Sequence, residues 1–402
     1  MKPTSLYRIV AVAGVLSLFI SYVGIWNRFV NDPVQRTGSD FIAFYSAGRV
    51  AQNQGISAVY DPRLQQMIQQ EEVGFTLAPG QVLLYNHLPF LVPLLQIIVS
   101  ENYVASLHRW VLLLMILYIL SVVVLSTISR QSGFNQESTV LTAVGALLFL
   151  PVFFSLMNGQ DTAILFLGAS IWMYGLLSGK EYLAGLGLSL TTVRPHIALI
   201  LAVPMFFRST RVFAAFLVGS LLLVLISISI LGRAGVQDFI EILFLSAGGE
   251  WYGMKESAMY NLIGLLSRTT PWLPAATIRW LGWILYAGAM VVLSLLWLRT
   301  REARNGLIGL SIIFALFFVP HLHFHDLALL LIPIYNVVQT HQDSGNVRPS
   351  FLALIPVALS LVLLLSNISP FLQYTIPYLI MLLLAIYSYP AARTFFTRPH
   401  QS

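Results

Sequence analysis

Long apolar runs with very few charges constrain this chain more than any other feature of the sequence. Only 9% of its 402 residues are charged, whereas soluble domains carry about 25%. Runs of this length match the thickness of a bilayer, and a helix satisfies its own backbone polar groups in lipid. The sequence therefore predicts an all-α, polytopic membrane helical bundle of about 10–13 transmembrane segments, with residues 1–402 forming one integrated domain.

The polar segments divide this bundle. The first apolar run, near Ile9 to Trp26, has no small-residue cleavage site and is interpreted as a retained helix. Residues 27–87 form a long first external loop, which we expect to contain short surface helices. The apolar run at 88–100 is too short to cross and is interpreted as re-entrant. Residues 182–207 are broken in the middle by a proline, and residues 233–272 form a second external loop.

The distribution of charge along the chain predicts its orientation. With the N-terminus inside, one side of the membrane receives 12 Lys/Arg and 4 Asp/Glu, and the other side receives 10 and 12. Short basic loops are typical of the cytoplasmic side. We therefore expect both termini in the cytoplasm of a cell whose plasma (inner) membrane holds the protein. The net charge of +6 then reflects sidedness and not nucleic-acid binding, and the absence of cysteine excludes thiolate metal sites.

Asp40 opens the longest polar segment, directly after the first apolar run. A carboxylate at the membrane boundary is suited to act as a general base, because partial desolvation favours its protonated form. The alternative is that Asp40 caps the helix that begins at Phe41. Both roles are compatible.

Arg194-Pro195-His196 interrupts an apolar stretch. An arginine inside such a stretch marks a functional site by default, and half-helix ends at membrane depth form anion sites. Arg194 is therefore a candidate ligand of a phosphate. The alternative is an arginine at a true span end that extends toward the interface.

Two polar motifs suit the recognition of a sugar. Asn158 and Gln160 offer both donors and acceptors to hydroxyl groups, although Asn-Gly also fits a simple turn between helices. Trp251, Tyr252 and Tyr260 in the second external loop are candidates for stacking on a sugar ring.

Three histidines alternate with other residues at His321, His323 and His325, followed by Asp326. This spacing places the rings on one side only in an extended segment, and Asp326 also suits a helix cap. We favour histidines that bind phosphate or sugar, or that shuttle a proton, over a metal site. An interfacial polar cap remains an alternative.

In order along the chain, these motifs resemble glycosyltransferase family 87, the GT-C membrane enzymes that include polyprenyl-phosphate-mannose-dependent mannosyltransferases. The resemblance covers about residues 38 to 335 and rests on the order of its motifs, which are Asp40-Phe41 with Tyr45, Tyr85 to Pro89, Asn158 to Gln160, Ala184 to Leu186, Arg194-Pro195, Tyr260-Asn261 to Arg268, and His325-Asp326. The chain departs from the family pattern where Arg194 replaces a lysine and where Leu-Ile-Gly follows Asn261.

The resemblance implies a GT-C fold and the inverting transfer of mannose or a related sugar from a polyprenyl phosphate to a lipid or glycan acceptor outside the cytoplasm. It implies Asp40 as the catalytic base and no cofactor or metal. The implied phosphate ligands are Arg194, His196, His323 and His325, and the implied sugar or acceptor ligands are Tyr45, Tyr85, Asn158, Gln160, Tyr260, Asn261 and Asp326.

Two other functions remain open from the residues alone. The broken helix at Arg194 also suits a transporter or flippase of a lipid-linked sugar. The histidine cluster also suits a metal-dependent hydrolase or ligase. A nucleotide-driven pump has no support, because the sequence contains no phosphate-binding glycine loop.

Overall fold

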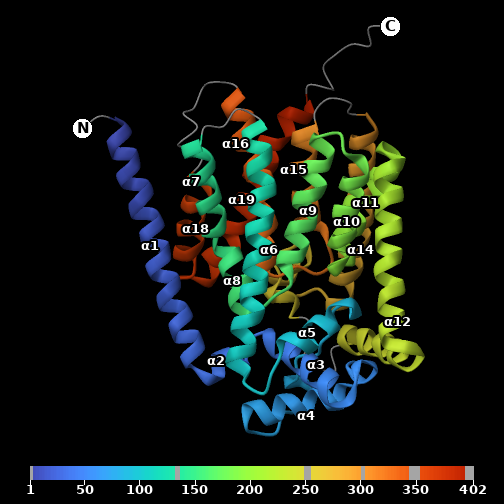
Figure 1. Cartoon of the computed structure of the whole chain (residues 1–402). Coiled ribbons are helices and arrows are strands. Elements are labelled where there is room, and N and C mark those ends of the chain that lie inside the picture. The colour runs from blue at the N-terminus through green and yellow to red at the C-terminus, as the bar shows by residue number, and fades with distance from the viewer. Residues whose placement is uncertain (1–2, 132–135, 249–254, 300–303, 344–353, 394–402) are drawn as a thin grey trace.

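The protein is a helical bundle with a layer of short helices across one end (Figure 1). The structure, a computed structural model, describes residues 3–131, 136–248, 255–299, 304–343 and 354–393. Every regular element in these ranges is a helix. The predicted all-α membrane bundle is confirmed.

Within the described ranges, five helices are long and apolar enough to cross a membrane, and one bent pair makes a sixth candidate. These are α1 (Pro3–Asn31), α6 (Tyr103–Gln131), α12 (Thr210–Gly248), α14 (Ala275–Arg299), α19 (Pro370–Arg393), and the pair α7 (Gln136–Leu147) and α8 (Leu150–Asn158), which bends by 42°. The shorter bundle helices are α9 (Thr162–Leu177), α10 (Glu181–Leu190), α11 (Pro195–Arg208), α15 (Arg304–Phe318), α16 (Leu331–Asp343) and α18 (Ile355–Ser366). The helices long enough to cross a membrane are fewer than the transmembrane segments that the sequence predicted. The reason is that several apolar runs form helices too short to cross a membrane alone.

The first external segment forms the layer of short helices, as predicted. Its elements are α2 (Pro33–Thr37), α3 (Phe41–Gln54), η1 (Ile56–Ala58), α4 (Pro62–Val73), η2 (Pro79–Gln81), η3 (Pro89–Leu91) and α5 (Val92–Ile98). Local sequence sets their ends. In α4, for example, the Asp61 carboxylate accepts the Arg63 backbone N–H, and Gly74 ends the helix with a left-handed backbone. The apolar run at 88–100 does not cross, because α5 has seven residues and packs on α3.

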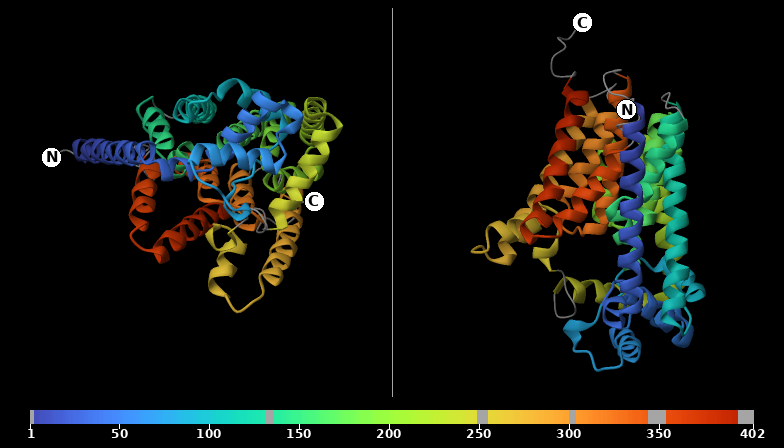
Figure 2. Two further views of the ribbon diagram at one scale, coloured as in Figure 1. Left: turned by 90° about the horizontal axis from the view of Figure 1, so that it is seen from below. Right: turned by 90° about the vertical axis from the view of Figure 1, so that its left-hand side faces the viewer.

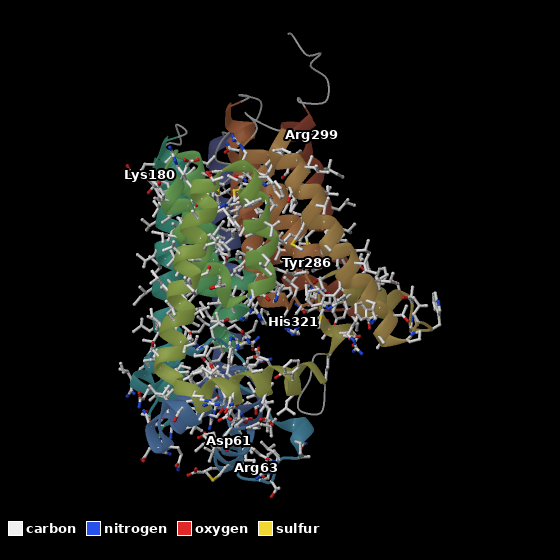
Figure 3. All side chains as sticks on the ribbon, turned by 90° about the vertical axis from the view of Figure 1, so that its right-hand side faces the viewer. Asp61, Arg63, Lys180, Tyr286, Arg299 and His321 are labelled. Atoms are coloured by element: carbon white, nitrogen blue, oxygen red, sulfur yellow. The ribbon has the colours of Figure 1, made fainter. Side chains whose placement is uncertain are left out.

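The second external segment begins inside a helix. At Gly232 the backbone of α12 adopts φ 64° and ψ −176°, so the helix kinks there. Beyond the kink, the second part of α12 lies across the lower end of the bundle (Figure 3). It contacts η1 and η3 of the first external segment. Residues 255–272 then form η5 (Glu256–Ala258) and α13 (Leu262–Thr269). Trp251 and Tyr252 lie outside the described residues.

The predicted break within 182–207 is confirmed. α10 ends at Leu190, a short η4 (Thr191–Val193) follows, and α11 starts at Pro195, whose missing N–H needs no partner in the first turn. Glycines let α10 pack closely on α9, because a Cβ on Gly168 would come within 2.7 Å of the Gly187 carbonyl oxygen. This packing fixes Arg194 at a turn between two bundle helices.

The two ends of the bundle differ in what they carry. α1 begins and α19 ends at the same end (Figure 1). Lys180 and Arg299 also lie at that end, whereas Asp61 and Arg63 lie at the opposite end (Figure 3). Seen from below, the short helices lie across part of this opposite end, beside the helices of the C-terminal half (Figure 2). The segments that the charge pattern assigned to opposite sides of the membrane are thus at opposite ends of the molecule.

Candidate active site

Four segment ends meet at one buried group of charged side chains. They are the start of α3 with Asp40, the corner between α8 and α9 with Gln160 and Asp161, the break before α11 with Arg194, and η6 (Phe324–Leu330) with Asp326. Side-chain hydrogen bonds and ion pairs link these residues, and the contact of Gln160 with Asp40 spans 120 positions of the sequence. Residues that are far apart in the sequence therefore meet at one place in the fold.

Arg194 is the centre of this group, and only 9% of its surface is exposed. Its Nη2 donates to the Gln160 Oε1 at 2.9 Å and lies 2.9 Å from the Asp161 Oδ1. Its Nε lies 3.8 Å from the Asp326 Oδ1. Its Nη1 donates to the Val193 carbonyl oxygen at 3.3 Å. Arg194 is thus paired with two buried carboxylates, with which a bound phosphate would share the guanidinium.

Asp161 is fully buried and has partners on both carboxylate oxygens. Its Oδ2 lies 2.8 Å from the His87 Nδ1, and its Oδ1 forms the ion pair with Arg194. Burial alone would raise the pKa of Asp161, but the nearby charge of Arg194, with a smaller contribution from His87, holds this pKa below its ordinary value. Asp161 therefore stays ionised and anchors both partners.

Asp40 does not cap the helix that follows it. Its side chain makes no capping hydrogen bond. One of its oxygens instead accepts a hydrogen bond of 2.6 Å from the Gln160 Nε2. Asp40 is half-buried, and this hydrogen bond holds its carboxylate at the edge of the group. The amide of Gln160 thus joins Asp40 to Arg194.

Asp326 is buried on the other side of Arg194. Its Oδ1 accepts a hydrogen bond of 3.0 Å from the Thr162 hydroxyl. Its Oδ2 lies 3.6 Å from the His325 Nε2 and accepts a weak bond of 3.4 Å from the His323 backbone N–H. Asp326 is not the N-cap that the sequence suggested, because η6 already begins at Phe324 and His323 is its N-cap. From inside the first turn, the Asp326 carboxylate accepts the His323 backbone N–H, and its ion pairs connect it to the charged group.

Four histidine rings form a continuous row that leads away from Asp326. The ring centroids are separated by 5.7 Å from His325 to His323, 4.6 Å from His323 to His321, and 6.3 Å from His321 to His196. Burial lowers the pKa of His323 to about 4, and the neighbouring His325 adds to this effect. Burial also lowers the pKa of His321 well below its ordinary value. His321 and His323 are therefore neutral at physiological pH.

Tyr260 and Asn261 occupy positions unlike the expected sugar contacts. The Asn261 side chain is fully buried, its amide donates to the Val319 carbonyl oxygen at 2.6 Å, and its oxygen accepts the Gly264 N–H. Tyr260 is 5% exposed and packs against Phe324. In this structure both residues hold α13 against the bundle, and the buried Asn261 amide bonds to the backbone on both its nitrogen and its oxygen.

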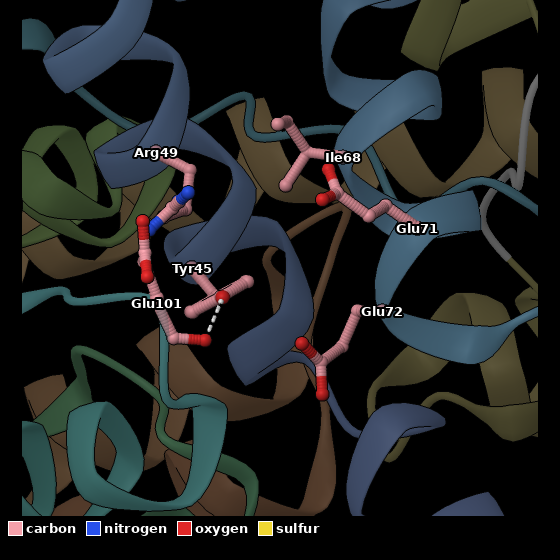
Figure 4. Close-up of a pocket in the computed structure, with 6 residues that line it drawn as sticks. All are labelled: Tyr45, Arg49, Ile68, Glu71, Glu72 and Glu101. Atoms are coloured by element: carbon pink, nitrogen blue, oxygen red, sulfur yellow. Dashed lines mark hydrogen bonds between the residues drawn. The ribbon is translucent and has the colours of Figure 1, made fainter.

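Tyr45 and Tyr85 are likewise buried among the short helices. The Tyr45 hydroxyl donates to the Glu101 carbonyl oxygen at 3.1 Å. Tyr45 lines a cavity of about 270 Å³, which Figure 4 shows. The cavity also has three glutamates and one arginine in its wall, namely Glu71, Glu72, Glu101 and Arg49. Burial raises the pKa of Tyr45 to about 12, with a smaller contribution from Glu72. Tyr85 is fully buried.

Asn158 ends α8 as a half-buried residue next to Gly159. Gly159 has a φ of 66°, which forms the predicted turn between two helices. The turn directs Gln160 and Asp161 into the charged group, so its main contribution is to position the two residues that follow it.

The described residues contain no group of three or more His, Asp or Glu side chains placed to hold one metal ion. The histidine row extends over successive ring contacts and does not surround a common centre.

Sequence reasoning missed His87, Asp161 and Thr162. His87 and Asp161 are 74 residues apart and form a contact of 2.8 Å. A signal for Asp161 was present, because it is a carboxylate inside a largely apolar stretch and directly follows the Asn-Gly-Gln motif. No local pattern distinguished His87 from an ordinary loop histidine.

The group is suited to a transfer reaction with a single base. Asp40 is a half-buried carboxylate with one fixed hydrogen bond. Asp161 and Asp326 form ion pairs with Arg194. The neutral side chains of His321 and His323 lie nearby. Such fixed groups orient a substrate with little reorganisation.

Comparison with known protein families matches residues 87–333 to glycosyltransferase family 87. A search among curated proteins found no match. The matched region is more than half of the chain and includes Asp161, Arg194 and Asp326, whereas Asp40 precedes it. With this match, and with the helical bundle around the charged group, the chain belongs to glycosyltransferase family 87 and is a multi-pass membrane glycosyltransferase.

Proposed function

We propose that this protein transfers a sugar, mannose or a related hexose or pentose, from a polyprenyl phosphate to a lipid or glycan acceptor on the extracytoplasmic face of the plasma (inner) membrane. The observation that carries the proposal is the way in which the Asp40 carboxylate is held. Its carboxylate is released from helix capping and held at 2.6 Å by Gln160, which is itself bound to Arg194. A base that accepts a proton must be fixed in this way before the reaction.

In the proposed reaction Asp40 accepts the proton of the acceptor hydroxyl as this oxygen attacks the anomeric carbon. The bond between the anomeric carbon and the phosphate oxygen breaks, and the polyprenyl phosphate leaves with the electron pair. A single displacement inverts the configuration at the anomeric carbon. Because the donor carries its own leaving group, the site needs no nucleotide.

We assign the leaving phosphate to His323 and His325. Both rings stand beside Asp326, and an imidazole N–H is a suitable donor to a phosphate oxygen. Arg194 orients Gln160, Asp161 and Asp326, and it contributes to the field at the site through these contacts. A guanidinium group suits this role because its five N–H donors point in fixed directions.

The experiment that tests the reaction class uses purified protein, polyprenyl phosphates that carry different sugars, and a lipid extract as the source of acceptors. We expect one donor to give polyprenyl phosphate together with a glycosylated product of inverted anomeric configuration. Release of free sugar without an acceptor product would indicate a hydrolase. Donor movement across vesicles without bond cleavage would indicate a flippase. Either result contradicts the proposal.

A further inference from the structure

His196 and His321 have ring nitrogens that are buried but make no hydrogen bond. The atoms are the Nε2 of His196 and the Nδ1 of His321. A buried polar atom without a partner lowers stability, so such atoms in native proteins need an explanation. Two of them on neighbouring rings indicate a place where a polar group of a ligand completes the structure.

The surrounding contacts fix both rings. His196 lies in the first turn of α11, and its backbone oxygen accepts a hydrogen bond of 2.7 Å from the Tyr286 hydroxyl of α14. The His196 and His321 rings lie edge-to-face, with 6.3 Å between their centroids. His321 in turn packs edge-to-face on His323, at 4.6 Å between centroids. Figure 3 shows His321 below Tyr286, above the part of α12 that crosses the end of the bundle.

The chemistry of the pair favours a hydroxyl group over a phosphate. Burial keeps His321 neutral, because it lowers the pKa of this ring well below its ordinary value. A neutral imidazole has one donor and one acceptor, which match the O–H and the lone pairs of a hydroxyl. The leaving phosphate is assigned to His323 and His325 beside Asp326, so the hydroxyl groups of the sugar are the polar groups of the donor that still lack a partner.

The position of the pair relates it to the donor. His196 follows Arg194 by two residues, and His321 is joined through His323 to His325 beside Asp326. The row therefore extends from the residues assigned to the phosphate toward α14. In a polyprenyl phosphate sugar, the hydroxyl groups of the sugar are the polar groups next to the phosphate.

We propose that His196 and His321 form a subsite that recognises a hydroxyl group of the donor sugar and so determines which sugar the enzyme accepts. The inference rests on the proposed function and adds two residues that select the substrate. A site that hydrogen-bonds a hydroxyl discriminates against the analogue without it, because the partner atoms are then left unpaired.

The test measures equilibrium binding in nanodiscs, so it does not depend on turnover. Binding of polyprenyl phosphates that carry mannose, glucose, galactose or arabinose is compared first, and the tightest binder is then radiolabelled. Its monodeoxy analogues are tested as competitors of this radiolabelled donor. We expect one deoxy analogue to bind wild-type protein at least about tenfold more weakly than its parent, the effect of about one hydrogen bond.

Matched variants separate the effect of the ring nitrogen atoms on binding from the effect of the volume that the rings fill. The amide nitrogen of Asn lies near the position of Nδ1, and that of Gln lies near Nε2. His321→Gln and His196→Asn therefore remove the unpaired atom, whereas His321→Asn and His196→Gln restore a polar atom at its place. We expect His321→Gln and His196→Asn to lose the tenfold preference for the parent donor over its deoxy analogue. His321→Asn and His196→Gln should keep part of this preference. His108→Asn on α6, an exposed position, is the control.

Three outcomes overturn the inference. If wild-type protein binds all deoxy analogues as well as the parent, the pair recognises no hydroxyl. If His321→Gln and His196→Asn weaken every analogue by the same factor, the rings have only a structural role. If they preserve the preference, the two nitrogens hold only water. A protein that binds and discriminates the donors but never transfers sugar would contradict the proposed function and leave this subsite standing.

Discussion

Arg194 connects three helix corners through one guanidinium group. Gln160, Asp161 and Asp326 all lie within 3.8 Å of its nitrogens. An arginine at such depth is expensive unless it is paired, and its loss leaves two buried carboxylates without a counter-charge. Stability and catalysis therefore depend on the same side chain.

We expect Arg194→Met to lower the free energy of unfolding by about 3–5 kcal/mol, the usual effect of breaking a buried ion pair. Adding Asp161→Asn should recover part of the loss, because the double variant buries one charge fewer. Thermal unfolding in detergent measures both effects, with the exposed Arg63→Met as the control. An unchanged melting temperature in Arg194→Met would show that the ion pairs do not stabilise the fold.

The buried histidines predict a pH dependence of stability. The pKa of His323 is lowered in the folded state to about 4 from its ordinary value of 6.5, chiefly by burial, and that of His321 is lowered too. Between pH 6.5 and 4 the unfolded chain binds protons that the folded chain does not, so stability decreases as the pH falls through this window. The lowered pKa of Asp161 affects stability only below the ordinary value of 3.8.

Melting temperatures at pH 7.5 and pH 5 check this expectation. The difference between them should be smaller in His323→Gln than in wild-type protein, and unchanged in His108→Gln. An equal decrease in all three proteins would mean that His323 is not the group responsible.

Single residues were predictable where chemistry is local and unpredictable where it depends on distant contacts. Asp40, Gln160, Arg194 and Asp326 were identified because each is a polar residue in an apolar context. The link from Asp40 to Gln160 spans 120 residues, so the sequence could not decide between capping and a free carboxylate. The hydrogen bond from the Asn261 amide to the Val319 carbonyl oxygen could not be predicted either, because it spans 58 residues.

The corner between α8 and α9 shows how an element positions the site. Gly159 has a φ of 66°, and a Cβ added there would lie 2.8 Å from the Cβ of Phe41. The indole of Trp110 also donates to the Gly159 carbonyl oxygen at 2.7 Å. Since Phe41 follows Asp40 directly, the glycine sets the distance between Asp40 and Gln160.

Gly159→Ala should therefore reduce both stability and activity. Overpacking of this kind lowers the free energy of unfolding by about 1–3 kcal/mol, and backbone strain at positive φ adds to it. Thermal unfolding and the sugar-transfer rate measure the two effects. Gly24→Ala is a matched control, because a Cβ there meets nothing within 4 Å. If both variants behave like wild-type protein, the close approach of Gly159 to Phe41 is not important.

Elements with strong local signals were predicted well. Pro195 located the break before α11, and the patterned stretches of the first external loop became α3 and α4. The extension of α12 beyond Gly232 was missed, because charged residues such as Arg233, Asp238 and Glu241 interrupt the apolar run there and suggest a loop. The helix continues there by packing on η1 and η3, a contact that no local sequence window contains.

On the scale of the whole molecule, the arrangement of the ends supports a single orientation in the membrane. Lys180 and Arg299 lie at one end, and the short helices with Arg63 lie at the other (Figure 3). We propose that the end with Lys180 faces the cytoplasm, as the positive-inside rule requires.

Cysteine labelling tests this orientation directly, since the natural chain contains no cysteine. In intact cells a membrane-impermeant maleimide should label Arg63→Cys, and it should label Lys180→Cys only after permeabilisation. Both positions are exposed, so access across the membrane is the main difference between them. The reverse labelling pattern would place the candidate active site on the cytoplasmic side.

The most direct test of the account compares Asp40→Asn with wild-type protein in the transfer assay with the accepted polyprenyl phosphate sugar. General base catalysis contributes about 10²–10⁴-fold. We expect a loss of transfer within this range, with the melting temperature and donor binding retained. Asp61→Asn, at an external helix cap, should remain active. Full activity of Asp40→Asn would contradict the assignment of the base and with it the proposed mechanism.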